Sequence, residues 1–243
     1  MVTPETENPS RRFPTTSWSI VSDAGRHGSG DALSKLCAAY WFPVYAFIRR
    51  RGYSREEAED LCQEFFTWIL QHGTLAAAHR ERGKFRSFLL ASVSNFLANE
   101  FDRSHAQKRG GGGATLSLDF QAGEARYHHE PGHQLTPEAL FERQWALALL
   151  DVVLARLREE HSRKGQAAQF DRLQMFLTGD QERGSYDQAA TILNISDAAV
   201  RTAVHRLRRR YAELIREEIA AIINDPDEVE GEIHFLLAAL GRG

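Results

Sequence analysis

Helical periodicity is the feature that most constrains the fold of this chain. Apolar residues recur at spacings of three and four through most segments, and patterns typical of strands are nearly absent. The stretch from Asp31 to about Arg51 shows the pattern clearly. Its apolar side consists of Leu33, Leu36, Tyr40, Val44 and Phe47. Pro43 lies inside this stretch, so we expect the helix either to kink there or to split in two. The sequence predicts an all-α fold.

Capping residues and helix breakers divide the chain into further helices. Ser54 and Glu57 have the spacing of a capping box, at the start of a helix that runs to about Gln71. Thr136 and Pro137 supply an N-cap followed by proline at the first helical position, and this helix runs to about residue 161. The other predicted helices cover about 84–103, 167–178, 185–193, 197–219 and 226–240.

Residues 106–135 interrupt the helices. This stretch holds four consecutive glycines, then mixed polar residues and a proline, which is typical of a flexible linker. We therefore expect two helical modules joined by a Gly-rich linker. The predicted division is a disordered N-terminus at 1–16, a first module at 17–108, the linker at 109–135, a second module at 136–222 and an extension helix at 223–243.

Charge and composition bear on the class of protein. The chain has 243 residues and a formal net charge of −3 at pH 7. It contains no apolar run near the roughly 20 residues that span a bilayer. Its polar N-terminus lacks the apolar core of a signal peptide, so we expect a cytoplasmic protein. The two cysteines, Cys37 and Cys62, form no CxxC pair. His128, His129 and His133 are expected to be solvated loop residues. We predict neither a metal site nor a cofactor.

Positive charge is concentrated in one short segment of this mildly acidic chain. Residues 195–210 carry five arginines against a single acid, Asp197. The apolar residues of this helix recur at helical spacing and are expected to face inward. They are Val200, Ala203, Val204, Leu207 and Tyr211. The opposite side is expected to carry Ala198, Arg201, Thr202, His205, Arg206, Arg208 and Arg209.

The preceding helix and turn suggest why the charge is there. Residues 185–193 form a first helix whose buried side would be Ala189, Ile192 and Leu193. Asn194 suits a left-handed helix end, and Ser196 suits the N-cap of the next helix. Two short helices with a three-residue turn and a basic second helix are typical of a DNA-binding helix-turn-helix. The alternative is an amphipathic surface helix with a solvated charged side.

An acidic stripe lies in the helix of the first module that begins near residue 54. Its apolar side would be Ala58, Leu61, Phe65 and Trp68, and a separate polar stripe consists of Asp60, Gln63, Glu64 and Thr67. Such a surface repels DNA and suits a basic protein partner. The alternative is again a plain solvated surface.

The next helix combines basic, aromatic and amide residues. The polar candidates are Arg82, Lys84, Arg86, Asn95, Asn99 and Arg103. Basic residues beside aromatic rings and amides suit single-stranded nucleic acid, because the charge follows the backbone and side chains hold unstacked bases. Phe88 and Phe96 are expected to belong to the core rather than to such a site.

Three segments, in this order, resemble bacterial RNA polymerase sigma factors of the two-domain extracytoplasmic-function type. Residues 58–70 resemble the helix that binds core polymerase, residues 85–103 the promoter-melting helix, and residues 185–210 the promoter-binding helix-turn-helix. The resemblance covers about residues 17–220. Shorter stretches near 15–21 and 39–54, and the glycine run, resemble a subgroup with a C-terminal extension.

The resemblance implies a role for each segment. Asp60, Gln63, Glu64 and Thr67 would bind the clamp of the polymerase's largest subunit. The basic side of residues 197–210 would bind the −35 promoter element as duplex. Residues 84–103 and the loop before them, about 74–84, would capture a flipped base of the −10 element. An anti-sigma factor or another regulator would be a further partner. The low net charge predicts weak DNA binding until polymerase holds both modules in register.

The last predicted helix has two readings. Asp225 suits a cap, Pro226 the first helical position and Glu228 the capping-box position. Its apolar stripe is Val229, Ile233, Leu236, Leu237 and Leu240. Because a lone helix of this length is marginal in water, it should pack on another surface. It either docks on its own C-terminal module, or acts as an auto-regulatory or partner-binding element.

Other functions explain less of the sequence. A conventional operator-binding regulator would use the same basic helix, and would form a symmetric dimer that binds DNA tightly without polymerase. An enzyme is disfavoured, because the sequence offers no nucleophile–base pair and no metal cluster, and the glycine run lacks the Lys-Ser/Thr end of a P-loop. An anti-sigma or scaffold protein would leave the basic helix unexplained.

Overall fold

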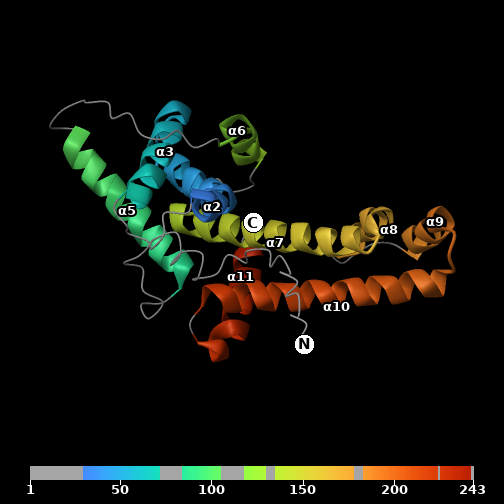
Figure 1. The fold of residues 1–243 in the computed structure, drawn as a ribbon. Coiled ribbons are helices and arrows are strands. Elements are labelled where there is room, and N and C mark those ends of the chain that lie inside the picture. Colours follow the sequence, from blue (N-terminus) through green and yellow to red (C-terminus); the bar gives the residue numbers. More distant parts are fainter. Residues whose placement is uncertain are drawn as a thin grey trace, which may run out of the picture.

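The structure is a computed structural model that describes residues 30–71, 84–104, 118–129, 135–177, 183–223 and 225–241. Side chains are described within 40–69, 84–100, 118–129, 135–177, 186–223 and 225–241. The described residues form nine α-helices and no strand, so the predicted all-α class is confirmed. Figure 1 shows how these helices are arranged.

The N-terminal helices have nearly the predicted bounds. They are α2 (Gly30–Arg50), α3 (Arg55–Gln71) and α5 (Phe85–Ser104). Helix α2 continues through Pro43, so the alternative of two separate helices is wrong. The predicted disordered stretch at 1–16 and the glycine run lie outside the described residues.

The later helices also follow the prediction, with one addition. They are α7 (Pro137–Arg163), α8 (Ala167–Leu173), α9 (Arg183–Leu193), α10 (Asp197–Ile222) and α11 (Val229–Leu240), with short 3-10 turns at Gln174–Phe176 and Pro226–Glu228. The addition is α6 (Phe120–His129), which lies within the predicted linker. For this part of residues 109–135 the linker prediction is wrong.

The caps predicted at Ser54 and Thr136 form, whereas Asp225 caps only the 3-10 turn before α11. The backbone N–H of Ser54 donates to the Glu57 carboxylate at 2.8 Å, and the N–H of Glu57 donates back to the Ser54 hydroxyl at 3.3 Å. Thr136 accepts from Ala139 N–H at the start of α7. Each bond satisfies a backbone donor that a helix start would otherwise leave without a partner.

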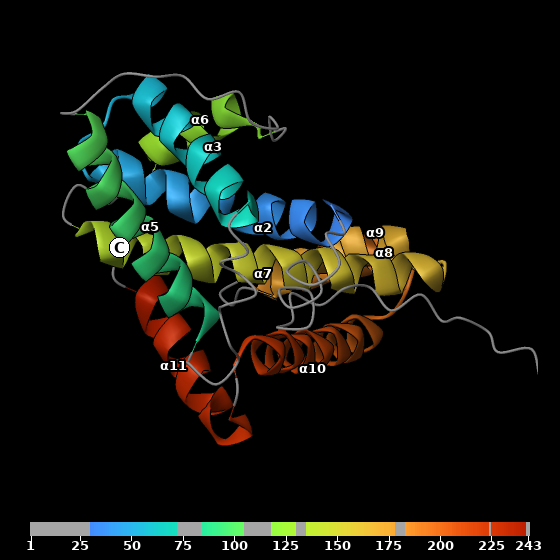
Figure 2. The same ribbon diagram turned by 60° about the vertical axis from the view of Figure 1, so that its left-hand side comes forward.

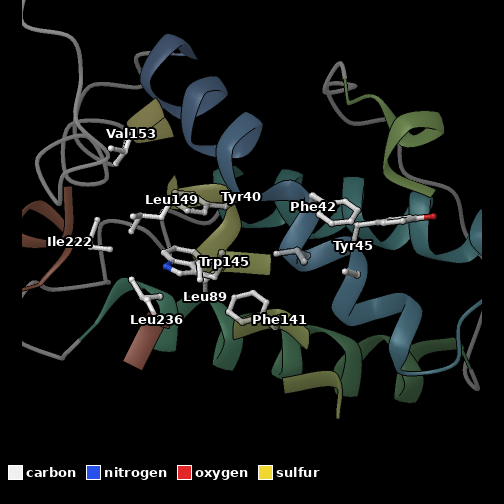
Figure 3. Packing of buried hydrophobic residues seen from close by; sticks show 14 of the residues in the cluster. Tyr40, Phe42, Tyr45, Leu89, Phe141, Trp145, Leu149, Val153, Ile222 and Leu236 are labelled. Carbon is white, nitrogen blue, oxygen red and sulfur yellow. The ribbon is translucent and has the colours of Figure 1, made fainter. Parts of the chain in front are cut away.

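One hydrophobic core joins segments that are far apart in the sequence. Helices α2 and α7 lie side by side (Figures 1 and 2), and the Tyr40 ring stacks on Trp145 with centroids 3.9 Å apart. Figure 3 shows Trp145 close to Tyr40 and Leu149, with Leu89 of α5 beside it. The described residues therefore give no support to two separately packed modules, because α7 belongs to the second predicted module and α2 to the first.

Helix α7 also carries the C-terminal helices. Its 27 residues make it about 40 Å long. Val153 and Leu157, in its second half, are buried, and α8 and α10 pack there. Helix α11 packs on α7 and α10 and is buried there at Leu236 and Ala239. The C-terminal helix thus docks on its own chain.

Helix α6 covers the outer side of α2. An added Cβ at Gly123 would come within 2.4 Å of the Trp41 ring, so any larger residue here would displace that ring. Glu124, one residue on, is buried and binds Arg49 at 2.8 Å and the Tyr45 hydroxyl. Tertiary contacts therefore hold this short helix in place.

Among the residues that the structure describes, none of the helices combines the length and the apolarity needed to traverse a bilayer.

Candidate nucleic-acid interface

The turn between α9 and α10 has the geometry that its sequence predicts. Asn194 adopts φ of 52°, the left-handed conformation that ends α9. The N–H of Ile195 reaches back to the Ala190 carbonyl at 3.1 Å. The Ser196 hydroxyl then accepts from Ala199 N–H at 3.2 Å and caps α10. These bonds fix the angle at which α10 leaves the turn.

Burial divides α10 into two sides. Val200, Val204 and Leu207 are at most 3% exposed and face the core. The opposite side, here called the basic face, consists of Ala198, Arg201, Thr202, His205, Arg206, Arg208 and Arg209, and all seven residues are exposed. The sequence predicts this division correctly.

Contacts within the protein orient two arginines of the basic face. The Arg201 Nε donates to Asp197 at 2.7 Å, and its guanidinium lies 4.8 Å from the centre of the Tyr186 ring. The Arg208 Nε donates to the Phe176 carbonyl at 2.8 Å. Tyr186 and Phe176 stack with centroids 4.4 Å apart. The support from these two aromatic residues carries no sequence signal, because they precede the arginines by 15 and 32 positions.

Arg210 does not belong to the basic face. Its guanidinium binds Glu160 of α7 at 2.8 Å, and Glu217 and Glu213 of α10 at 2.9 and 3.2 Å. Its hydrogen bonds hold the pKa of Glu160 below the ordinary value, although burial opposes this shift. This arginine therefore joins α7 to α10.

The first helix of the pair is less buried than predicted. Ala189 is buried and Leu193 half-buried, but Ile192 is 57% exposed. The prediction of a buried Ile192 is wrong. The three positions do not all lie on the side that meets α10.

The acidic stripe of α3 lies at the surface. This acidic face consists of Asp60 and Glu64, which are exposed, and Gln63 and Thr67, which are half-buried. Partial burial, with the negative charges of Glu100 and Asp60, raises the pKa of Glu64. Glu100 on α5 is a member of this cluster that the sequence analysis misses, because only tertiary packing brings α5 beside α3.

The two faces lie at opposite ends of the molecule. In Figure 1 helix α3 is at the upper left, and the corner between α9 and α10 is at the far right. Figure 2 also separates α3 from α9. Opposite charges on the two faces therefore do not pair with each other.

The basic residues of α5 are not where the sequence predicts. Arg86 is buried, with its side chain 7% exposed, and Lys84 is half-buried. Both bind the Glu232 carboxylate of α11, at 3.2 and 2.7 Å. Arg86 and Lys84 are therefore closed off in this arrangement of the chain, and their binding of nucleic acid stays a prediction.

The other predicted strand-binding residues around α5 are the asparagines and two further arginines. Asn95 and Asn99 are exposed. Phe96 is buried and Phe88 packs half-buried against the core, as expected. Arg82 and the loop before α5 lie outside the described residues, as does the side chain of Arg103.

The described residues contain no cluster of histidine, cysteine or acidic side chains that could hold a metal ion. His128 and His129 lie on α6 rather than in a loop, and His128 Nε2 is 3.1 Å from Glu124. His133 lies outside the described residues. Cys62 is buried, and its thiol lies 3.8 Å from the Trp41 carbonyl.

Comparison with known proteins adds no relative: no protein family matches this chain, and no curated protein or solved structure is significantly similar to it.

Proposed function

We propose that this chain is a sigma-type transcription initiation factor, which binds core RNA polymerase and directs it to promoters. The observation that carries the proposal is the exposed basic face of α10, set behind a capped three-residue turn, at the opposite end from the exposed acidic face of α3. The order of the sequence segments that resemble sigma factors supports the same reading.

The basic face suits duplex DNA. An α-helix fits the major groove, and arginine binds either guanine edges or phosphates there. The Asp197 carboxylate accepts from Arg201 Nε at 2.7 Å and from Arg201 Nη2 at 3.4 Å, and so orients its guanidinium. Arg206 and Arg209 are exposed beside it. In this proposal the basic face binds the −35 element.

The acidic face suits a basic protein surface. Partial burial raises the pKa of Glu64, and the neighbouring charges of Glu100 and Asp60 raise it further, so these carboxylates repel one another in the free protein. A cationic partner relieves that repulsion, whereas DNA increases it. In this proposal the acidic face binds the clamp of the largest polymerase subunit.

The net charge of −3 explains why polymerase is needed. Non-specific DNA affinity grows with the number of phosphates that a protein neutralises. The basic face alone neutralises few, so we expect the isolated chain to bind promoter duplex more weakly than about 1 nM at physiological salt. Polymerase that holds the chain beside DNA converts the weak contact into an intramolecular one.

Transcription with purified core polymerase tests the proposal. A library of promoter-length DNA fragments from the source genome serves as template, with and without this chain. The proposal predicts that the chain co-elutes with core polymerase, and that specific transcripts form only when it is present. Tight, polymerase-independent binding by a symmetric dimer would instead favour an operator-binding regulator. Absence of both polymerase binding and DNA binding would contradict both functions.

A further inference from the structure

The C-terminal helix places a buried carboxylate on the basic residues of α5. Glu232, in the first turn of α11, is 1% exposed. Lys84 Nζ lies 2.7 Å from one of its oxygens and Arg86 Nε lies 3.2 Å from the other. Glu228, one turn earlier, is 3.8 Å from Lys84. Both cations come from the start of α5, and the acids come from 144 to 148 residues away.

Arg86 has further partners around the same carboxylate. Its guanidinium lies 3.9 Å from the centre of the Phe235 ring of α11, and Nη1 is 3.3 Å from Glu142 of α7. An aromatic ring against the guanidinium and an anion at its edge make up the environment that single-stranded nucleic acid also offers, through stacked bases and phosphates.

Helix α11 packs on the core mainly through half-buried residues, which are Val229, Ile233, Phe235 and Leu240. Only Glu232, Leu236 and Ala239 of its 12 residues are buried. Leu237, on its apolar stripe, is 60% exposed. One of the three buried side chains is thus a carboxylate whose desolvation is offset by Lys84 and Arg86. Because nine of its 12 residues are half-buried or exposed, we expect α11 to open more easily than the core around α2 and α7.

We infer that α11 competes with single-stranded nucleic acid for Lys84 and Arg86. In the free protein the Glu232 carboxylate occupies the position that a backbone phosphate takes when α11 moves away. This inference rests on the proposed function, because it explains how a strand can reach two residues that are closed off here. It also gives the C-terminal helix a regulatory role: the strand-binding residues become available only when α11 is displaced.

Strand binding by the full-length chain tests the competition. The probe is a fluorescent single-stranded DNA of about ten nucleotides, followed by anisotropy. Glu232→Gln keeps the size of the side chain and removes its charge, and we expect it to tighten binding about fivefold or more. Glu230→Gln is the matched control. Glu230 lies on the same helix and carries the same charge, but it pairs with Arg216 of α10 at 2.8 Å.

The control and a double variant separate local competition from general charge. Both single variants change the net charge equally, so equal affinities for the strand would overturn the inference. In a chain that carries Glu232→Gln together with Lys84→Met, the increase in affinity for the strand that Glu232→Gln gives should be largely lost. A gain that persists in full would mean that the strand binds elsewhere, and would also overturn it.

Hydrogen exchange on the unmodified chain tests the competition without any substitution, so the result does not depend on whether the variants fold. Saturating single-stranded DNA should speed amide exchange in residues 229–240 while α2 and α7 stay protected. Unchanged exchange in α11 with the strand bound would contradict the competition.

The transcription assay distinguishes this inference from the proposed function. If the chain directs polymerase to promoters but Glu232→Gln and Glu230→Gln behave alike, only the competition fails. If neither the unmodified chain nor the variants bind polymerase, the proposed function fails.

Discussion

At the scale of single residues, the Glu124 carboxylate links α6 to α2. Burial alone would raise the pKa of Glu124, but hydrogen bonds from Arg49 and Tyr45, with the charge of Arg49 and that of His128 when protonated, lower it below its ordinary value. Burial, and then the contact with Glu124, raise the pKa of the Tyr45 hydroxyl far above its ordinary value. The ionised carboxylate with a protonated phenol is therefore the form that stabilises the fold.

Glu124→Gln should lower the free energy of unfolding at pH 7 by about 1–3 kcal/mol. Because the folded-state pKa of Glu124 is lowered, its contribution is fully present above the unfolded value of about 4.3 and is lost as pH falls through the folded-state pKa. Chemical denaturation at about pH 7 and at about pH 3.5 measures how far the free energy of unfolding falls between the two pH values. This fall should be smaller in Glu124→Gln than in the unmodified chain.

Glu138→Gln is the control, because the Glu138 side chain is half-exposed and lies 3.7 Å from Arg51. It should lower the free energy of unfolding by less than about 1 kcal/mol. Equal pH dependence in Glu124→Gln and the unmodified chain would contradict this account.

Gly123 and Gly231 make a matched pair of glycines. A Cβ at Gly123 meets the Trp41 ring at 2.4 Å, whereas a Cβ at Gly231 of α11 meets nothing within 4 Å. We expect Gly123→Ala to destabilise the chain by about 1–3 kcal/mol through overpacking. Gly231→Ala should stabilise it by up to about 1 kcal/mol through helix propensity. Thermal denaturation measures both changes in stability. If both variants were stabilised, or both destabilised, the close contact between Gly123 and the Trp41 ring would be ruled out as the cause.

At the scale of elements, local signals predict most helices and miss one. The spacing of apolar residues and the caps at Ser54, Thr136 and Ser196 give bounds close to those observed. Helix α6 follows a glycine run, and its local signal is a single cap, the Asp119 carboxylate, which accepts from Ala122 N–H at 3.0 Å. Phe120, Gly123 and Glu124 pack on α2 and stabilise the helix. Single-sequence patterns record local preference, so an element that tertiary contacts create escapes them.

The Ser196 cap offers a test at this scale. Ser196→Ala removes the acceptor for Ala199 N–H and should destabilise the α9–α10 corner by about 1 kcal/mol. Thr191→Ala on α9 is the control. Its hydroxyl bonds only to the Asp187 carbonyl one turn back, and alanine has the higher helix propensity, so stability should hold or rise. Urea denaturation followed by circular dichroism measures both. Equal losses in the two variants would contradict the capping role.

The candidate site was predictable where exposure follows from amphipathic spacing, and unpredictable where distant segments meet. The basic face of α10 is exposed as the spacing predicts, and so are Asp60 and Glu64 of the acidic face of α3. The burial of Arg86 was not predictable, because its partners Glu142 and Glu232 lie 56 and 146 residues away. An arginine on a helix favours solvent unless distant acids compensate its charge.

At the scale of the whole molecule, the shared core is the main departure from the sequence-based expectation. Tyr40 stacks on Trp145, and α5, α7 and α11 meet around Arg86 and Glu232. Segments that were predicted to belong to a first module, a second module and an extension thus depend on one another. A partner that separates α2 from α7 would have to expose large apolar surfaces of both helices.

Cooperative unfolding tests the shared core. We expect one calorimetric transition for the isolated chain, and Trp145→Leu should shift that whole transition to lower temperature, with a loss of about 2–4 kcal/mol. Met175→Leu is the control, because Met175 is 48% exposed and should leave the transition almost unchanged. Two transitions, of which Trp145→Leu shifts only one, would show that the two halves fold separately.

The most direct test of the central claim, that α3 holds polymerase while α10 holds promoter DNA, is run-off transcription combined with polymerase retention on two double variants. Asp60→Asn with Glu64→Gln should lose both polymerase retention and transcript. Arg201→Ala with His205→Ala should keep polymerase retention and lose the promoter-specific transcript. Loss of polymerase retention in the second variant, with promoter choice unchanged, would contradict the division of roles between the two faces.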